Sequence, residues 1–188
     1  MNPFIDRVHT HITPLSADAQ QDIAAHLQQT IFHKGDIINN EGAICRKLFL
    51  IEKGLVKHFY YHNGRRFVIR FFSEGDFFTV LDSFIPQQPA DFTTVALEET
   101  SVFYLEYDDV ERLAKKHHSF ETFLRMLYAG AALHNLNRIK EMFNNDAAAL
   151  YRSFVANNAH LLQRITLGDI AGYLGISQVS LSRIRANK

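Results

Sequence analysis

The sequence contains no tryptophan, only four prolines among 188 residues, and a single cysteine, Cys45. One thiol excludes an intramolecular disulfide, a cysteine-ligated iron–sulfur cluster and a structural zinc site built on several thiolates. No run approaches the roughly 20 apolar residues that a membrane-spanning helix needs, and the first residues show no basic-then-apolar leader. We therefore expect a cytoplasmic protein that has no contact with a membrane.

Bulky apolar residues are abundant despite the missing tryptophan. The chain has 16 phenylalanines and 7 tyrosines, and 47% of its residues are hydrophobic, which is enough for one large core and a smaller second domain. The net charge is zero, but residues 150–188 hold five basic residues against Asp169 alone, a local excess of +4. Such a basic surface suits a polyanionic partner, and a solvated basic tail is the alternative.

The first part of the chain predicts helix followed by short strands. From Pro3 to Leu27 the pattern is helical, and Ser16 can cap a helix. From Ile31 the apolar residues alternate and glycines arrive at intervals typical of turns. The clearest hairpin lies between Lys57 and Phe72, because Asn63-Gly64 is the preferred pair of a type I′ turn. Further strands are predicted over Phe77–Val80, Phe92–Leu97 and Ser101–Leu105. Short strands at this spacing predict a sandwich or barrel.

A long helix is predicted from about Asp108 to Asn144, a stretch without proline. We expect one apolar face to pack on the strands, and it consists of Met126, Leu133, Leu136, Ile139 and Phe143. A second face recurs at coiled-coil spacing and consists of Phe120, Leu124, Leu127, Ala131 and His134. Two apolar faces need two partners, so we expect the second to form a homodimer; a helix wrapped by its own domain is the alternative. Polar residues at 144–146 predict a hinge between domains 1–144 and 145–188.

The last two dozen residues predict two short helices joined by a tight turn. Thr166 can cap the first helix with Asp169 as its reciprocal partner. Gly175 follows the last periodic apolar residue, where a left-handed backbone ends a helix, and Ser177 can cap the second helix. This arrangement is that of the helix-turn-helix unit of DNA-binding proteins, although helical hairpins of enzymes share it.

The second of these helices divides into two faces. Leu181 and Ile184 lie one turn apart and predict a buried side. The opposite, water-facing side carries Gln178, Val179, Ser182 and Arg183. An amide, a hydroxyl and a guanidinium on one face can meet base edges and phosphates.

Several motifs in order resemble one family. They are Gly35-Asp36, Gly42, Leu48-Phe49-Leu50-Ile51, Gly54, Phe71 through Gly75-Asp76-Phe77-Phe78, Ala96–Thr100, Leu161–Ile165, Ala171–Ser177 and Leu181–Ile184. Together they resemble the Crp/Fnr superfamily of bacterial transcription regulators over nearly the whole chain. The resemblance implies an α+β fold, with an N-terminal double-stranded, jelly-roll-like β-roll flanked by helices, a long dimerisation helix over about 108–144, and a C-terminal helix-turn-helix DNA-binding domain. Because the sequence ends soon after the second helix, we expect no full β-hairpin wing.

The resemblance also implies which residues meet DNA. Base reading falls on Gln178, Val179, Ser182 and Arg183, phosphate contacts fall on Thr166, Ser177 and Ser180, and Arg185 lies beside them. Arg183 is the most informative, because an arginine can donate two hydrogen bonds to guanine. The implied partners are double-stranded DNA, a second copy of the chain, RNA polymerase and an unidentified small-molecule effector.

The effector pocket departs from the family pattern. A cyclic-nucleotide pocket grips the ribose with a glutamate and the phosphate with an Arg-Ser pair, and those positions are Val80, Ala90 and Asp91 here. An aspartate repels a phosphodiester, so we expect that cyclic AMP does not bind in the usual way. The candidate pocket comprises Gly75, Phe78, Thr79, Val80, Leu81, Ala90, Asp91 and Thr93. Either it holds another ligand or the roll is only a scaffold.

Ten histidines raise the question of haem or a metal ion. His58 and His62 lie by the predicted hairpin and His117-His118 precede a predicted helix, so we expect all four to be exposed. The strands lack the His-x-His of a cupin metal site, and no nucleophile with a base and no phosphate-cradling loop is evident. We expect no cofactor, no metal and no enzyme activity. The alternative to a DNA-reading regulator is a ligand-binding or protein-docking module whose helix-turn-helix unit no longer reads DNA.

Overall fold

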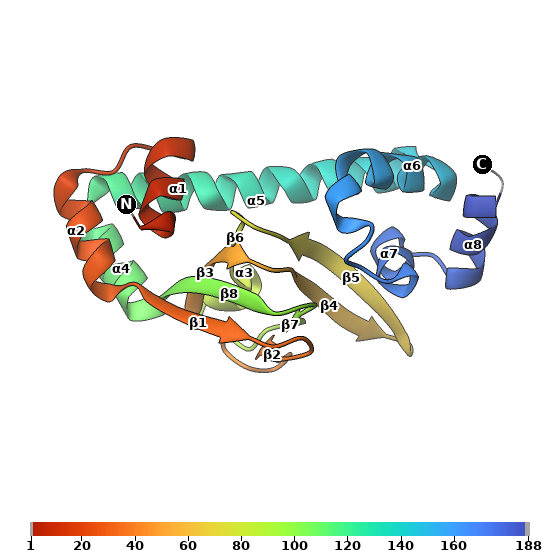
Figure 1. Ribbon diagram of the computed structural model, residues 1–188, viewed down its shortest axis with the longest axis horizontal. Helices are drawn as coiled ribbons and strands as arrows, with labels where there is room; N and C mark the ends of the chain where they lie inside the picture. The colour runs from red at the N-terminus through yellow and green to blue at the C-terminus, as the bar shows by residue number, and fades with distance from the viewer. Residues whose placement is uncertain (1, 187–188) are drawn as a thin grey trace.

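A computed structural model describes residues 2–186. The helices are α1 (Pro3–His11), α2 (Ala17–His26), α3 (Leu81–Phe84), α4 (Tyr107–Lys116), α5 (His118–Asn144), α6 (Ala147–Asn157), the 3-10 turn η1 (Ala159–Leu161), α7 (Leu167–Leu174) and α8 (Gln178–Ala186). The strands are β1 (Gln28–Phe32), β2 (Ile37–Asn39), β3 (Lys47–Lys53), β4 (Val56–His62), β5 (Arg65–Phe72), β6 (Phe77–Phe78), β7 (Thr93–Ala96) and β8 (Thr100–Glu106). As Figure 1 shows, α5 runs along one side of the strands, and α6, α7 and α8 lie at one end of the molecule. Within residues 2–186, every helix is too short or too polar to cross a membrane.

The strands form two antiparallel four-stranded sheets. One has the order β1-β8-β3-β6 and the other β2-β7-β4-β5. Phe49, Ile51 and Val102 of the first sheet pack against Val56 and Phe72 of the second, which closes the pair into a β-roll. The predicted strands and roll are therefore confirmed.

The turn between β4 and β5 is the one that the sequence predicts. Asn63 and Gly64 have φ values of 50° and 72°, and positive φ at both central residues defines a type I′ turn. Its handedness matches the twist of the flanking strands, and the hairpin runs beside α7, which packs on β5 (Figure 1).

The N-terminal segment, predicted to be helical over Pro3–Leu27, forms the two helices α1 and α2. Pro14 lies between α1 and α2, where it cannot donate the backbone hydrogen bond that a continuous helix needs. Ser16 caps α2 as predicted, and its hydroxyl accepts a hydrogen bond from the Ala19 N–H at 3.3 Å.

The helix predicted over about 108–144 is likewise divided, and α4 and α5 meet at His117. This residue has an extended backbone, and its Nε2 lies 2.7 Å from Oδ2 of Asp22 in α2. Its side chain is buried, so the expectation that His117 is exposed is wrong, because the contact with Asp22 draws the ring inward. His118 and His62 are exposed as predicted.

The structure differs from the prediction for both apolar faces of α5. The face expected to pack on the strands is exposed, and the face expected to form a dimer is buried at Phe120 and Leu124. Phe120 and Leu124 are buried in the main core of the monomer, where Phe120 contacts Phe123, and Phe123 contacts the Phe4 ring of α1. The exposed apolar residues of α5 are Met126, Leu133, Leu136, Ile139, Met142 and Phe143. Phe120 and Leu124 are not available to a second copy of the chain, because α1 and the roll already cover them.

The C-terminal helices share a core with the roll. α6 begins after Asp146, whose carboxylate accepts a hydrogen bond from the Ala149 N–H at 2.7 Å. The shared core comprises Leu55, Val68 and Phe71 of the roll with Leu150, Tyr151, Phe154, Leu161, Ile170, Ala171, Leu174 and Leu181 of the C-terminal unit. Apolar packing therefore holds the C-terminal helices against the roll.

Candidate functional site

The helix-turn-helix unit forms as its capping residues predict. Thr166 Oγ1 accepts a hydrogen bond from the Asp169 N–H at 3.1 Å, and the Asp169 carboxylate accepts one from the Thr166 N–H at 3.3 Å. Gly175 ends α7 with a φ of 71°, a left-handed conformation that glycine adopts without steric cost. Ser177 Oγ accepts from the Ser180 N–H at 3.0 Å and so caps α8.

α8 presents a polar and basic surface to solvent. Leu181 is fully buried and Ile184 packs against the same core. Six exposed residues of α8 and its cap are here called the α8 face: Ser177, Gln178, Val179, Ser182, Arg183 and Arg185. Thr166 is exposed at the start of α7 and Ser180 is half-buried beside Ser177. All eight residues that the resemblance assigns to DNA therefore lie in this one unit.

A buried ion pair holds α7 on the roll. Lys57 Nζ of β4 donates to Asp169 Oδ1 at 2.5 Å, both side chains are at most 5% exposed, and Arg66 of β5 approaches the same oxygen at 3.0 Å. Burial alone would raise the pKa of Asp169, but hydrogen bonds from Lys57 and Thr166 outweigh burial and hold the pKa below its usual value. One carboxylate thus caps α7 and attaches it to the sheet.

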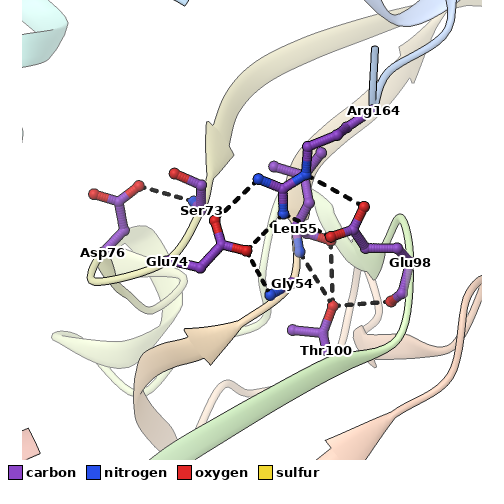
Figure 2. Close-up of polar contacts among 8 residues, drawn as sticks. All are labelled: Gly54, Leu55, Ser73, Glu74, Asp76, Glu98, Thr100 and Arg164. Atoms are coloured by element: carbon purple, nitrogen blue, oxygen red, sulfur yellow. Dashed lines mark hydrogen bonds and ion pairs between the residues drawn. The ribbon is translucent and has the colours of Figure 1, made fainter. Parts of the chain in front are cut away.

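A second polar cluster attaches the segment before α7 to two turns of the roll (Figure 2). Arg164 donates to Glu74 at 2.9 and 2.7 Å and to Glu98 at 3.3 and 2.6 Å. Glu74 also accepts from the Gly54 N–H at 2.9 Å. The hydrogen bonds from Arg164 lower the pKa of Glu74 to about 2. Two-pronged pairing of this kind fixes the orientation of both partners.

Close packing completes the contact between the two parts. A Cβ on Gly172 of α7 would lie 2.9 Å from the carbonyl oxygen of Arg66 in β5, so the helix backbone lies directly on the strand. Arg138 of α5 donates to the Tyr173 carbonyl, and its guanidinium lies 4.0 Å from the centroid of the Tyr173 ring. The helix-turn-helix unit therefore contacts both the roll and α5.

A cavity of about 620 Å³ lies between the roll and α5, and its size is that of a small-molecule site. Of the predicted pocket residues, Gly75, Phe78, Thr79 and Leu81 line it. Leu127 and Ala131 of α5, which the sequence places in a dimer contact, line it as well. They face the monomer's own cavity because the buried side of α5 continues past Leu124.

The other four predicted pocket residues lie outside this cavity. Val80 and Ala90 are buried in the main core, where neither side chain can reach a ligand. The Asp91 N–H donates to Asp82 Oδ2 at 3.1 Å, and Thr93 Oγ1 accepts from the Glu41 N–H at 3.2 Å. Phe92, between Asp91 and Thr93, is the residue of this segment that lines the cavity.

His58 is buried in the cavity wall, and the expectation that it is exposed is wrong. Its ring packs against Phe72, Phe78 and Phe92. Nε2 lies 3.3 Å from the Thr79 carbonyl, which can only accept, and Nδ1 lies 2.8 Å from Thr94 Oγ1, so the neutral ring donates at Nε2 and accepts at Nδ1. Burial lowers the pKa of His58 to about 3. Within residues 2–186, no three His, Cys, Asp or Glu side chains gather to hold a metal ion.

Arg70 of β5 is the cavity residue that the sequence interpretation misses. Its guanidinium carbon lies 4.8 Å from the centroid of the Phe72 ring, and it forms neither a hydrogen bond nor an ion pair with any residue in the described part of the chain. Burial lowers the pKa of this guanidinium, and the Asp76 charge opposes that effect. The sequence feature that could have indicated Arg70 is that it is a single arginine, between Ile69 and Phe71, in an otherwise apolar half of the strand.

Comparison with known proteins agrees with this architecture. The family model of the cyclic nucleotide-binding domain matches residues 29–117, which span the roll and α4. FixK2 of Bradyrhizobium japonicum superposes with a TM-score of 0.76 at 19% identity, over 86% of this chain and 83% of that one. A Crp/Fnr-family transcriptional regulator of Eubacterium rectale gives a TM-score of 0.75 at 17% identity, over 92% of this chain and 83% of that one. Residues 29–117 are thus similar to the cyclic nucleotide-binding domain, and the chain has the fold of the solved Crp/Fnr proteins.

A third solved structure has a similar fold. CLP of Xanthomonas campestris, described as a c-di-GMP-responsive global regulator, gives a TM-score of 0.66 at 16% identity, over 92% of this chain and 91% of that one. No curated protein sequence matches the chain significantly.

Proposed function

We propose that this Crp/Fnr-fold protein is a transcription regulator that binds double-stranded DNA through the α8 face. It acts as a homodimer on a site with two-fold symmetry, and the roll is its sensor domain. A role in transcription regulation is supported by the fold that this protein shares with the solved regulators.

The observation that carries this proposal is the α8 face itself. Leu181 and Ile184 satisfy the packing of the helix, so packing gives no reason for Gln178, Ser182 and Arg183 to lie together on the exposed side. A guanidinium can pair with guanine O6 and N7, and an amide can pair with adenine. The caps Thr166 and Ser177 place hydroxyls at the starts of α7 and α8, where the helix N-termini favour phosphate.

The homodimer is proposed through the free face of α5. Met126, Ala129, Leu133, Leu136 and Phe143, here called the α5 stripe, are exposed and recur at intervals of three, four and seven residues. This is the spacing of a coiled-coil contact. A second copy of α5 is the partner that such a spacing fits, and a two-fold axis through this contact would present two α8 faces to one duplex.

The experiment that tests the proposal is selection of the purified protein on random-sequence duplex DNA at near-physiological salt, without an added effector. Enrichment of a two-fold-symmetric site, with half-sites about one helical turn (~34 Å) apart, is the expected result. Arg183→Ala should weaken binding to that site by about ten- to a hundredfold, because a bidentate contact to guanine contributes about 1–3 kcal/mol.

The matched control is Arg46→Ala. It removes the same charge from an exposed position on the roll, away from α8, and should leave the selected site and its affinity unchanged. Unchanged site preference in Arg183→Ala would contradict the assignment of the α8 face. No enrichment with or without a metabolite extract would favour a protein-docking module over a DNA-reading regulator.

A further inference from the structure

Arg70 is an unpaired cation in the wall of a cavity that is otherwise largely apolar. Phe72, Phe77, Phe78 and Phe92 surround the cavity together with residues of α5. The second arginine of the wall, Arg7, already donates its Nε–H to the Gly75 carbonyl at 2.9 Å. Arg70 has no such partner within the described residues, so its five N–H donors are left for a ligand or for water.

Four other polar residues of the wall are neutral or already engaged. His58 is neutral and both of its ring nitrogens are engaged. Burial and the charges of Arg70 and Arg138 lower the pKa of His134, which keeps that ring neutral near pH 7. The Asp76 and Asp82 carboxylates accept the N–H groups of Ser73 and Asp91 at 2.8 and 3.1 Å, so both are held in place as acceptors.

The charges of the wall limit the charge of an occupant. Two arginines, Arg7 and Arg70, are balanced by Asp76 and Asp82. A single negative charge placed at Arg70 pairs with a cation that has no ion-pair partner among residues 2–186, whereas a second would lie close to the two carboxylates without a partner. The phenylalanine rings require that the rest of the ligand be apolar.

We propose that this cavity binds a small organic carboxylate with an aromatic or aliphatic body, and that Arg70 holds its carboxylate. The guanidinium pairs with both carboxylate oxygens, and the body packs against Phe72, Phe78 and Phe92. This inference names the effector class of the proposed sensor, and its regulatory meaning rests on the proposed function, although the binding itself does not.

The position of Arg70 gives such a ligand a route to the helix-turn-helix unit. Arg70 and His134 also line an adjoining cavity of about 230 Å³, whose wall includes Tyr173 of α7 and His160. Neutralising Arg70 therefore changes the field at the contact between α7 and α5, where Arg138 holds Tyr173. A ligand at Arg70 therefore changes the charge next to the contact between the helix-turn-helix unit and α5.

The test uses a pair of fluorescent probes on the full chain. 8-Anilinonaphthalene-1-sulfonate is an apolar body with one negative charge, and N-phenyl-1-naphthylamine is the same body without it. The charged probe should bind at least tenfold more tightly than the neutral one. 4-Phenylbutyrate should displace it, and neither 4-phenylbutan-1-ol nor inorganic phosphate should do so at the same concentration.

Variants locate the site. Arg70→Gln should weaken binding of the charged probe about tenfold or more and leave the neutral probe unchanged, while Arg70→Lys should fall between because it loses the two-pronged pairing. Arg46→Gln is the matched control, because Arg46 is exposed and does not line the cavity, and its binding should stay within about threefold of the wild type. Thermal unfolding checks that each variant is folded. If Arg70→Gln does not fold, Arg70→Lys is the variant that tests the site.

Three outcomes would overturn the proposal. Equal binding of the two probes would place them on an apolar surface such as the α5 stripe. Unchanged binding in both Arg70 variants would exclude Arg70 as the anion partner. Stronger displacement by cyclic AMP or c-di-GMP than by 4-phenylbutyrate would assign the cavity to a nucleotide. No DNA is present in these titrations, so their failure is distinct from failure of the DNA selection.

Discussion

Gly172 lies where the backbone of α7 meets the backbone of β5, and it offers a test of the contact between the two parts. A Cβ there would lie 2.9 Å from the Arg66 carbonyl oxygen and 3.3 Å from Cγ2 of Val68. The first neighbour is backbone and cannot rotate away. Gly172→Ala should therefore destabilise the protein by about 1–3 kcal/mol through overpacking, measured as a lower midpoint of unfolding in guanidinium chloride.

Gly130→Ala is the matched control. Gly130 lies within α5, and a Cβ there would meet no atom within 4 Å. Alanine has the higher helix propensity, so this variant should be more stable by about 0.5–1 kcal/mol. If the two substitutions shifted the unfolding midpoint in the same direction by similar amounts, α7 would not be packed on β5 in solution.

Single residues also mark where sequence reasoning succeeds and where it stops. Thr166, Gly175 and the Asn63-Gly64 pair act on neighbours within a few positions, so local rules predict their conformations. His58 and Arg70 acquire their surroundings from α5 and from loops far along the chain. The sequence beside Arg70 shows only one charge in an apolar half of a strand, and the neighbours of His58 do not indicate that its ring is buried and neutral.

At the scale of elements, α5 shows why the candidate dimer face was assigned wrongly. Both sides of the helix carry leucine, phenylalanine or methionine, so periodicity identifies two apolar faces but not their partners. Which face is buried depends on the main core, where Phe120 and Leu124 pack with residues of α1 and the roll. Only the folded arrangement leaves Leu133 and Leu136 free.

Leu133→Lys tests the proposed dimer contact through the α5 stripe. Leu133 is 61% exposed in the monomer, so lysine there should not disturb the monomer fold, but two lysines facing each other across a two-fold axis repel and remove apolar contact. We expect the wild-type protein to be a dimer and Leu133→Lys to be a monomer at micromolar concentration, measured by light scattering after gel filtration.

Ile31→Lys is the control for this variant. Ile31 lies on β1, is 58% exposed and is as apolar as Leu133, but it lies outside the α5 stripe. The control should remain a dimer. A wild-type protein that is monomeric at every concentration, or a Leu133→Lys protein that stays dimeric, would contradict the contact.

At the scale of the whole molecule, the sensor and the helix-turn-helix unit are one packed body. Apolar residues of β5, α6 and α7 form a common core, and polar contacts from Asp169 and Arg164 surround it. The helix α5 ends at Asn144, where the sequence places a hinge, but the shared core holds the C-terminal unit on the roll. Any change of position of the α8 face must first break these contacts. The free-energy cost of moving the unit therefore depends on Arg164 and Asp169.

The contribution of Arg164 should depend on pH in a defined direction. The pKa of Glu74 is lowered to about 2 from a usual value near 4.5, so the carboxylate binds its proton more readily in the unfolded chain than in the folded one. The stabilisation is complete above about pH 4.5 and is lost as the pH falls toward 2. Arg164→Gln removes the cation that lowers this pKa and should lose the same contribution.

The difference in unfolding free energy between wild type and Arg164→Gln is therefore the quantity to measure, at pH 7, 4.5, 3.5 and 2.5. It should be constant from pH 7 to about 4.5 and then shrink, because below its usual pKa Glu74 binds a proton in the unfolded chain, and keeping the carboxylate ionised beside Arg164 in the folded wild type then costs free energy. Arg152→Gln, at an exposed position of α6, should give a small difference that does not change with pH. A wild-type advantage that persists undiminished at pH 2.5 would mean that Arg164 acts by packing rather than through the carboxylates, and that acid would not release the unit from the roll.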